Sequence, residues 1–224
     1  NTNDAPTISS TAVTAVDEDA AYTYTATGAD VDSGDTLTLS ASVPSWLTFT
    51  ASTGVLAGTP TNDEVGSHSV TITVEDAAGA TGTQTFTITV ANTNDAPSVT
   101  STAVTAVDED SAYSYSITTA DVDSGDSAAI TCSCPSWITL TDAGDGTATI
   151  AGTPTNDDVG TTSVTVTVTD GSSATGTQTF DIVVSNTNDA PTISSTAVTA
   201  VDEDAAYTYT ATGADVDSGD TLTL

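Results

Sequence analysis

Apolar residues alternate with threonine or serine along most of this chain. The alternation is clearest in 20–27, 67–75 and 82–90, where nearly every second side chain is apolar. A period of two indicates half-buried β-strands, because successive side chains of a strand point to opposite faces of a sheet. No stretch of similar length has the helical period, so the pattern predicts an all-β protein. In the first part of the chain we expect seven strands, at 7–16, 20–27, 36–43, 46–50, 54–58, 67–75 and 82–90.

The chain is built from repeats. Residues 186–224 reproduce residues 1–39 letter for letter, and a weaker copy between them carries NTNDAP at 92–97, VDED at 107–110 and DVDSGD at 121–126. A recurring unit of roughly 90 residues is typical of a tandem array of small domains. Because the third copy covers only the first three strands, we expect the chain to be a window of a longer array. The expected domains are 1–91, 92–185 and the partial repeat 186–224.

Seven short strands separated by turn residues favour a Greek-key β-sandwich. We therefore expect tandem seven-stranded sandwiches joined end to end, with antiparallel strands. Trp46 and Trp137 each follow a Pro-Ser step and are expected to fill the cores. An exposed tryptophan that stacks on a sugar is the alternative.

Charge restricts the possible functions. The chain has no Lys or Arg against 31 Asp and Glu, which gives a formal net charge of −31. Phosphate recognition requires cationic side chains, so a nucleic-acid partner is excluded, and an anionic membrane surface would repel the chain. No apolar run reaches the ~18 residues of a membrane-spanning helix. His68 is the only histidine and has no nucleophile beside it in the sequence, so we expect a strand-surface residue and no enzyme.

An odd number of strands sorts the loops between the two ends of a sandwich. The chain enters at one end and leaves at the other, so the acidic loops of two successive repeats should meet at the linker. At the first joint these are Glu18, Asp63, Glu64, Asn92, Asn94 and Asp95 with Asp121, Asp123 and Asp170. At the second joint they are Glu109, Asp157, Asp158, Asn186, Asn188, Asp189, Asp215 and Asp217. The first repeat offers Asp4, Asp30, Asp32 and Asp76 to a preceding repeat.

A cluster that contains only oxygen ligands selects hard cations, and a flexible set of many ligands favours Ca²⁺ over Mg²⁺. The sequence therefore predicts Ca²⁺ at each joint. The alternative is that the loop acids are simply solvated.

These motifs resemble the cadherin superfamily. NTNDAP is similar to the cadherin linker between repeats, VDED to the segment that carries a calcium-binding Glu, and ADVDSGD to the Asp-x-Asp-x-Gly motif. PSWLTFTASTGVLAGTPTNDEVG is closer to the dystroglycan-type cadherin-like, or immunoglobulin-like, repeat of large bacterial surface adhesins. The resemblance implies calcium ligands at Glu18, Glu109, Glu203, Asp30, Asp32, Asp121, Asp123, Asp215, Asp217, Asp76 and Asp170. The first linker position is Asn92 or Asn186 where cadherins have Asp, which removes one charge from each site.

Cys132 and Cys134 stand where the first repeat has Ala41 and Val43. We expect two buried free thiols, because side chains at i and i+2 of an extended strand stand too far apart for an unstrained disulfide. Crosslinking between chains is a minor option.

Together these patterns predict a secreted, cell-surface structural protein. We expect a Ca²⁺-rigidified spacer segment of a giant bacterial surface protein. Its partners would be the neighbouring repeats of the same chain and, if the chain assembles into a filament, copies of itself. Two alternatives stay open. One is a subunit of an extracellular filament or sheath completed by strand addition, and the other is a carbohydrate- or ice-binding module.

Overall fold

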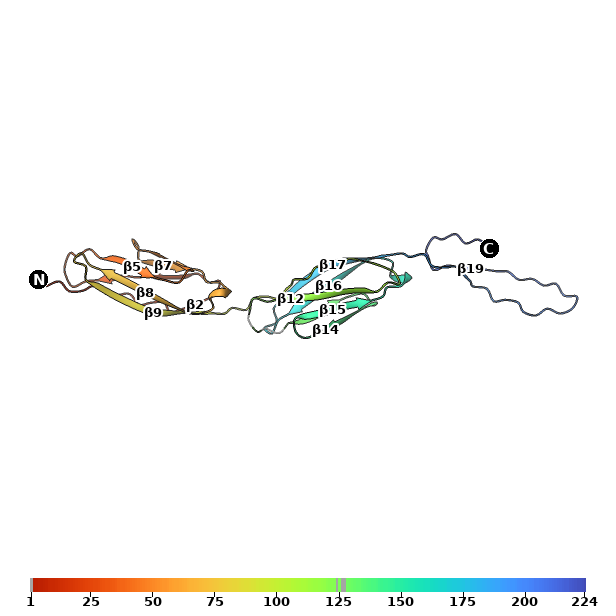
Figure 1. Cartoon of the computed structure of the whole chain (residues 1–224), viewed down its shortest axis with the longest axis horizontal. Helices are drawn as coiled ribbons and strands as arrows, with labels where there is room; N and C mark the ends of the chain where they lie inside the picture. Colours follow the sequence, from red (N-terminus) through yellow and green to blue (C-terminus); the bar gives the residue numbers. More distant parts are fainter. Residues whose placement is uncertain (1, 124, 126–127) are drawn as a thin grey trace. The chain divides into compact units, whose positions relative to one another are not determined.

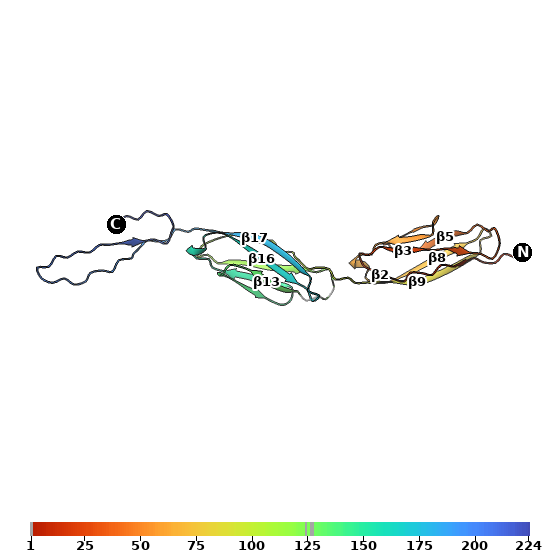
Figure 2. The same ribbon diagram turned by 180° about the vertical axis from the view of Figure 1, so that it is seen from behind.

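The computed structural model describes residues 2–123, 125 and 128–224, which fall into two compact units, Asn1–Asp95 and Ala96–Leu224. Strands dominate the structure, and the only helices among the described residues are two short 3₁₀ turns. Figures 1 and 2 show each complete repeat as two packed layers of strands. The prediction of tandem all-β sandwiches is confirmed.

The first unit contains two sheets and a short two-stranded ladder. One sheet has the order β2-β9-β8-β5, the other has the order β3-β7-β6, and β1 pairs with β4. The elements are β1 (Thr7–Ile8), β2 (Ala15–Asp17), β3 (Tyr22–Thr25), β4 (Gly28–Ala29), β5 (Thr38–Ser42), β6 (Leu47–Thr50), β7 (Val55–Gly58), η1 (Asn62–Glu64), β8 (Gly66–Glu75) and β9 (Thr81–Ala91).

The first predicted strand is in fact two strands. β1 pairs with β4 in antiparallel register, whereas β2 pairs with β9 in parallel register. The expectation of one continuous strand at 7–16 and of purely antiparallel pairing was therefore wrong. The segment between Ile8 and Ala15 carries the chain from the β1–β4 ladder to the edge of the β2-β9-β8-β5 sheet.

The core lies between the two layers. Leu56, Ile72 and Ile88 are fully buried there, and Trp46 packs against the same cluster with its ring edge-on to Tyr22, 5.9 Å between centroids. The prediction that Trp46 and Trp137 fill the cores is confirmed in part, because both are half-buried and pack against the buried clusters.

The second repeat has the same plan. Its sheets have the orders β11-β17-β16-β13 and β10-β12-β15-β14. His68 faces Ile88 across β8 and β9, and Thr162 faces Ile182 at the same register position of the second repeat. The elements are β10 (Ser98–Val99), β11 (Ala106–Asp108), β12 (Tyr113–Ala120), β13 (Ala129–Ser133), β14 (Ile138–Asp142), β15 (Thr147–Gly152), η2 (Asn156–Asp158), β16 (Gly160–Thr169) and β17 (Thr175–Ser185).

His68 is half-buried. Its ring stands edge-on to that of Trp46, with 5.8 Å between centroids, and Nε2 lies 2.6 Å from the carbonyl oxygen of Glu64. The expected surface position is therefore only partly right, because the ring covers the indole.

Cys132 and Cys134 form a disulfide, so the expectation of two free thiols was wrong. The Cα atoms are 5.4 Å apart, closer than two residues of an extended strand and within the usual range for a disulfide. The reason is local, since β13 ends at Ser133 and the chain turns away from the sheet between the two cysteines.

Residues 186–224 show how strongly the same sequence depends on its partners. They form only the short ladder of β18 (Thr192–Ile193) and β19 (Gly213–Ala214). Tyr207 is 54% exposed, whereas Tyr22, the same residue of the identical segment, is 3% exposed. In the first unit β3 pairs with β7, and the described part of 186–224 contains no strand that could play the role of β7. Alternating sequence alone does not make these residues a strand.

Candidate metal site

Glu109 is the centre of an acidic site in the second unit. It lies in the turn between β11 and β12 and is 2% exposed. Its backbone N–H donates to the carbonyl oxygen of Ser185 at the end of β17 (2.9 Å), and its Oε1 accepts from the N–H of Thr187 (2.5 Å). Asp110 follows in the left-handed region (φ 57°), where Asp is tolerated. The turn is thus fixed against the exit of the last strand.

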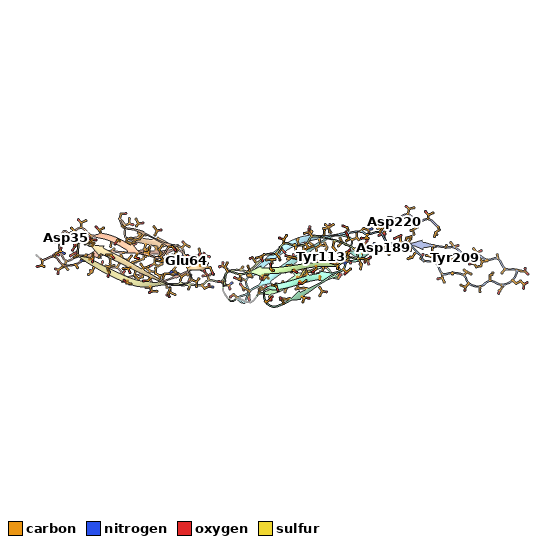
Figure 3. The ribbon with its side chains drawn as sticks, viewed as in Figure 1. Asp35, Glu64, Tyr113, Asp189, Tyr209 and Asp220 are labelled. Atoms are coloured by element: carbon orange, nitrogen blue, oxygen red, sulfur yellow. A yellow bond between two sulfur atoms is a disulfide. The ribbon has the colours of Figure 1, made fainter. Side chains whose placement is uncertain are left out.

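Asp189 and Asp217 join this site from the segment after β17. The N–H of Asp189 donates to Oδ2 of Asp217 (2.6 Å), and Nδ2 of Asn186 donates to Oδ1 of Asp217 (3.0 Å). Asp217 is 7% exposed, and its own N–H donates to Oδ1 of Asp215 (3.0 Å). Figure 3 labels Asp189 and Asp220 in this segment.

The three carboxylates have the spacing of a cation site. Glu109, Asp189 and Asp217 each offer an oxygen, and these oxygens lie within 4.8 Å of one another. Two ligands of one Ca²⁺ at 2.3–2.6 Å are at most about 5 Å apart, so the spacing fits. Oε2 of Glu109 is buried and has no hydrogen-bond partner. A buried carboxylate oxygen without a donor is costly unless a cation binds it.

The electrostatics of the site agree with this geometry. Loss of hydration raises the pKa of Asp189, and the negative charges of Asp217, Asp110, Glu109 and Asp215 raise it further. A divalent cation would reverse this effect, because it favours the ionised form of every ligand. Asn186 can take part as well, since rotation of its amide exchanges nitrogen and oxygen.

Some predicted residues of this joint lie outside the three-carboxylate group. Oδ2 of Asp158 accepts from both the N–H and the hydroxyl of Thr155 (2.9 Å each), which caps the 3₁₀ turn. Asp157 and Asn188 are exposed, and Nδ2 of Asn188 donates to the carbonyl oxygen of Asp189 (2.7 Å). Asn156 lies outside the predicted set, and its Nδ2 donates to Oδ1 of Asp217 (3.3 Å).

At the end of the first unit where β9 leaves the sandwich, the acids have the same arrangement around Glu18. This residue is 3% exposed, its Oε1 accepts from the N–H of Thr93 (2.6 Å), and its Oε2 is buried without a partner. Asp95 offers an oxygen within 4.8 Å of that of Glu18. Other predicted residues are placed as follows: Asn92 accepts from Asn62 (3.5 Å), Asn94 donates to the carbonyl of Asp95 (2.7 Å), Glu64 caps Thr61 (2.8 and 2.9 Å), and Asp63 is exposed.

The opposite end of the first unit, where the chain enters β1, gathers the acids predicted there. The N–H of Asp4 donates to Oδ2 of Asp32 (2.8 Å), and the N–H of Asp32 donates to Oδ1 of Asp30 (2.8 Å). The hydrogen bond that Oδ2 of Asp76 accepts from Nδ2 of Asn3 (2.8 Å) lowers the pKa of Asp76. Oxygens of Asp30, Asp35 and Asp76 lie within 4.8 Å of one another.

At the end of the second repeat where the chain enters β10, Asp121 and Asp123 lie in one loop. There the N–H of Asp123 donates to Oδ1 of Asp121 (2.9 Å). Oδ2 of Asp121 is buried without a partner. Asp170 accepts from the N–H of Ala174 (2.8 Å). Residues 124 and 126 of this DVDSGD turn, and residue 127 after it, lie outside the described residues.

The third acid of the DVDSGD turn was missed. Asp35 groups with Asp30 and Asp76, and Asp220 groups with Asp215 and Asp217. Loss of hydration raises the pKa of Asp35, followed by the charges of Asp30, Asp32 and Asp76. The recurrence of this Asp in every copy of the motif was the signal that could have found it.

Among the residues that the structure describes, no helix has the length and apolar character to cross a membrane.

The solved structures most like this one include cadherin arrays. Extracellular domains 3–6 of protocadherin gamma B2 align with a TM-score of 0.60 at 17% identity, over 85% of this chain and 49% of that one. Domains 1–5 of the same protein align with a TM-score of 0.58 at 18% identity, over 85% and 41%. At these identities the likeness establishes the fold alone.

An endo-fucoidan hydrolase of glycoside hydrolase family 107 aligns with a TM-score of only 0.38 at 26% identity, over 82% of this chain and 29% of that one. The chain thus spans less than half the length of each of these solved chains. No curated protein sequence matches it.

A family model described as "Putative Ig domain" matches residues 5–91 and again residues 96–185, which together make up most of the chain. The two matched segments contain the two complete sandwiches, and the cadherin-like and immunoglobulin-like architecture predicted from the motifs is confirmed. The chain therefore belongs to the Putative Ig domain family, of which it carries two copies in tandem.

Proposed function

We propose that this chain is a segment of an extracellular rod, in which Ca²⁺ binds where one β-sandwich repeat meets the next and stiffens the joint. The repeats would be 1–91, 92–185 and 186–224. The role is structural and non-catalytic, as a spacer or extender of a large bacterial surface protein. The Cys132–Cys134 disulfide supports an extracellular location, because disulfides persist in oxidising compartments.

One observation carries this proposal. Oε2 of Glu109 is buried, has no hydrogen-bond partner, and belongs to a residue whose carboxylate groups with those of Asp189 and Asp217. Oε2 of Glu18 is unpartnered in the same way in the first unit. The repetition argues that the orphaned oxygen is a built feature of the VDED turn, which a cation would satisfy.

The mechanism follows from where the ligands come from. Glu109 belongs to the folded second repeat, whereas Asp189 and Asp217 belong to the segment after β17. Without a cation these carboxylates repel one another, so the joint is a hinge. A bound Ca²⁺ would supply the positive charge that holds the two ligand sets together. At a free Ca²⁺ concentration ten times the dissociation constant, one such site contributes about 1.4 kcal/mol.

The direct test is calcium titration calorimetry on the full chain. Asp217→Asn removes the carboxylate that accepts from Asn186 and from the N–H of Asp189, so it should lower the affinity of that joint by roughly tenfold or more. Asp181→Asn is the matched control, because it removes the same charge from the exposed side of β17 and should leave the titration unchanged.

Small-angle scattering tests the mechanical part. When Ca²⁺ replaces a chelator, the maximum dimension of the chain should rise, and the spread of maximum dimensions across the population should narrow. An identical scattering curve in both conditions, or a titration in which Asp217→Asn behaves like Asp181→Asn, would remove the basis of the proposal.

The residues that the structure describes give no support to a sugar site or an enzyme site. A pocket of about 510 Å³ lies between the loop at Thr119–Gly125 and the turn at Gly144–Gly146, and its described lining consists of Asp, Gly, Ala, Thr and Pro. Stacking on a sugar requires an aromatic face, and both tryptophans pack against the cores.

A further inference from the structure

The Cys132–Cys134 disulfide lies where the chain changes sheets. β13, which holds Cys132, is an edge strand of one sheet, and β14 is an edge strand of the other. The connection runs from Cys134 through Trp137, and the N–H of Ile138 donates to the carbonyl oxygen of Pro135 (3.0 Å). The disulfide therefore closes a small ring at the start of this connection.

The first repeat provides an internal comparison. Ala41 pairs with Ile72 as Cys132 pairs with Val166, and the N–H of Leu47 makes the same turn bond to Pro44 (3.1 Å). The two repeats thus share the connection, and only the second has a covalent link in it. Both cysteines are half-buried and pack against the core that contains Ile130 and Ile138.

We propose that the Cys132–Cys134 disulfide is a redox-sensitive lock on the connection between the two sheets of the second repeat. When it is closed, the end of β13 and the approach to Trp137 are restrained. When it is reduced, the two thiols still pack as small apolar groups in the folded repeat. The unfolded chain, however, regains the conformational freedom that the closed ring had removed, so the folded repeat becomes less stable. The stability of this one repeat then depends on the thiol–disulfide balance of its surroundings.

The exchange that opens the lock is an ordinary thiol–disulfide reaction with a dithiol. A thiolate of the dithiol attacks one cysteine sulfur, the S–S bond breaks, and the other cysteine leaves as a thiolate that takes up a proton. The second thiol of the reagent then displaces the first cysteine, so the protein gains two electrons and two protons while the dithiol becomes a cyclic disulfide. No group other than the dithiol is needed.

The test is differential scanning calorimetry of the full chain at saturating Ca²⁺, with and without dithiothreitol. Reduction should lower the unfolding temperature of the second repeat by roughly 5–10 °C and leave the first repeat unchanged. The double variant Cys132→Ala/Cys134→Val carries the residues of the sister repeat. It should unfold at the lower temperature from the outset and should not respond to dithiothreitol.

Hydrogen exchange separates this lock from a general loss of stability. After reduction, residues 133–138 should exchange faster, while the equivalent residues 42–47 of the first repeat should not change. Iodoacetamide should modify neither cysteine before reduction and both after it. Labelling without reductant, or an unfolding profile that dithiothreitol does not alter, would overturn the proposal.

Discussion

Replacing Glu109 by Gln should have opposite effects with and without calcium. The substitution keeps an oxygen for the N–H of Thr187 and removes the negative charge from a side chain that is 2% exposed. Without a cation, the wild-type Oε2 is a buried oxygen with no donor; such a group costs about 1–3 kcal/mol, and more when it is charged. The amide of Gln can instead donate to the neighbouring carboxylates, so the variant should be the more stable protein in a chelator.

With calcium the order should reverse. A site at 100 times its dissociation constant contributes about 2.7 kcal/mol, and much of this would be lost with a charged ligand. For a domain of this size, 1 kcal/mol corresponds to roughly 4–8 °C in Tm. The assay is thermal unfolding by circular dichroism, in chelator and in excess Ca²⁺, with Asp181→Asn as the control for a lost charge. A shift of the same sign in both conditions would refute the reasoning.

Three further predictions concern the sandwiches themselves. Tyr22→Ala should lower the free energy of unfolding by about 3–5 kcal/mol, because Tyr22 is 3% exposed. Tyr207→Ala, in the identical segment, removes a side chain that is 54% exposed and should change it by about 0.5 kcal/mol or less. Chemical denaturation measures both. Burial raises the pKa of Tyr22 and of Tyr113 to about 12, so these side chains ionise at lower pH in the unfolded chain than in the folded one. Both repeats should therefore lose stability as the pH rises from 10 to 12. Absorbance at 295 nm reports the ionisation, and circular dichroism reports the unfolding. Gly82→Ala should lower the Tm of the first repeat, because a Cβ there would overlap the carbonyl oxygen of Pro6; an unchanged Tm would show that the strand can shift without cost.

The strand content was predictable because one face of each sheet is buried. Val70, Ile72 and Val74 are fully buried in β8, and Thr71 and Thr73 between them lie on the outer face. This alternation leaves a period of two in the sequence. Most of the acids that the structure groups were also visible, since the acidic motifs recur with the repeat.

Three features could not be read from the pattern. The division of the first strand depends on which sheet offers an edge at each position, and that is decided by strands far along the chain. The disulfide depends on the turn after Ser133, which a period of two does not reveal. Asn156 belongs to the site only because the η2 turn brings its amide to Asp217.

The identical segments mark the limit most clearly. Residues 1–39 contribute Tyr22 and Tyr24 to a closed core, and Tyr24 donates from its hydroxyl to Oε1 of Gln84 (2.8 Å). Residues 186–224 have the same letters but leave Tyr207 exposed. The difference lies in the contacts with strands such as β7 and β9, so structure here belongs to the whole repeat and not to the segment.

The parallel pairing of β2 with β9 has a mechanical consequence. These strands lie near the two ends of the first repeat, and three residue pairs, Ala15 with Thr89, Val16 with Val90 and Asp17 with Ala91, join them. Tension drawn through the termini would pull the two strands lengthwise past each other. All the hydrogen bonds of the pair would then be loaded in shear at once, unlike a hairpin that is peeled open one bond at a time. A repeat built in this way resists stretching through the geometry of its first and last strands, whatever the strength of its core.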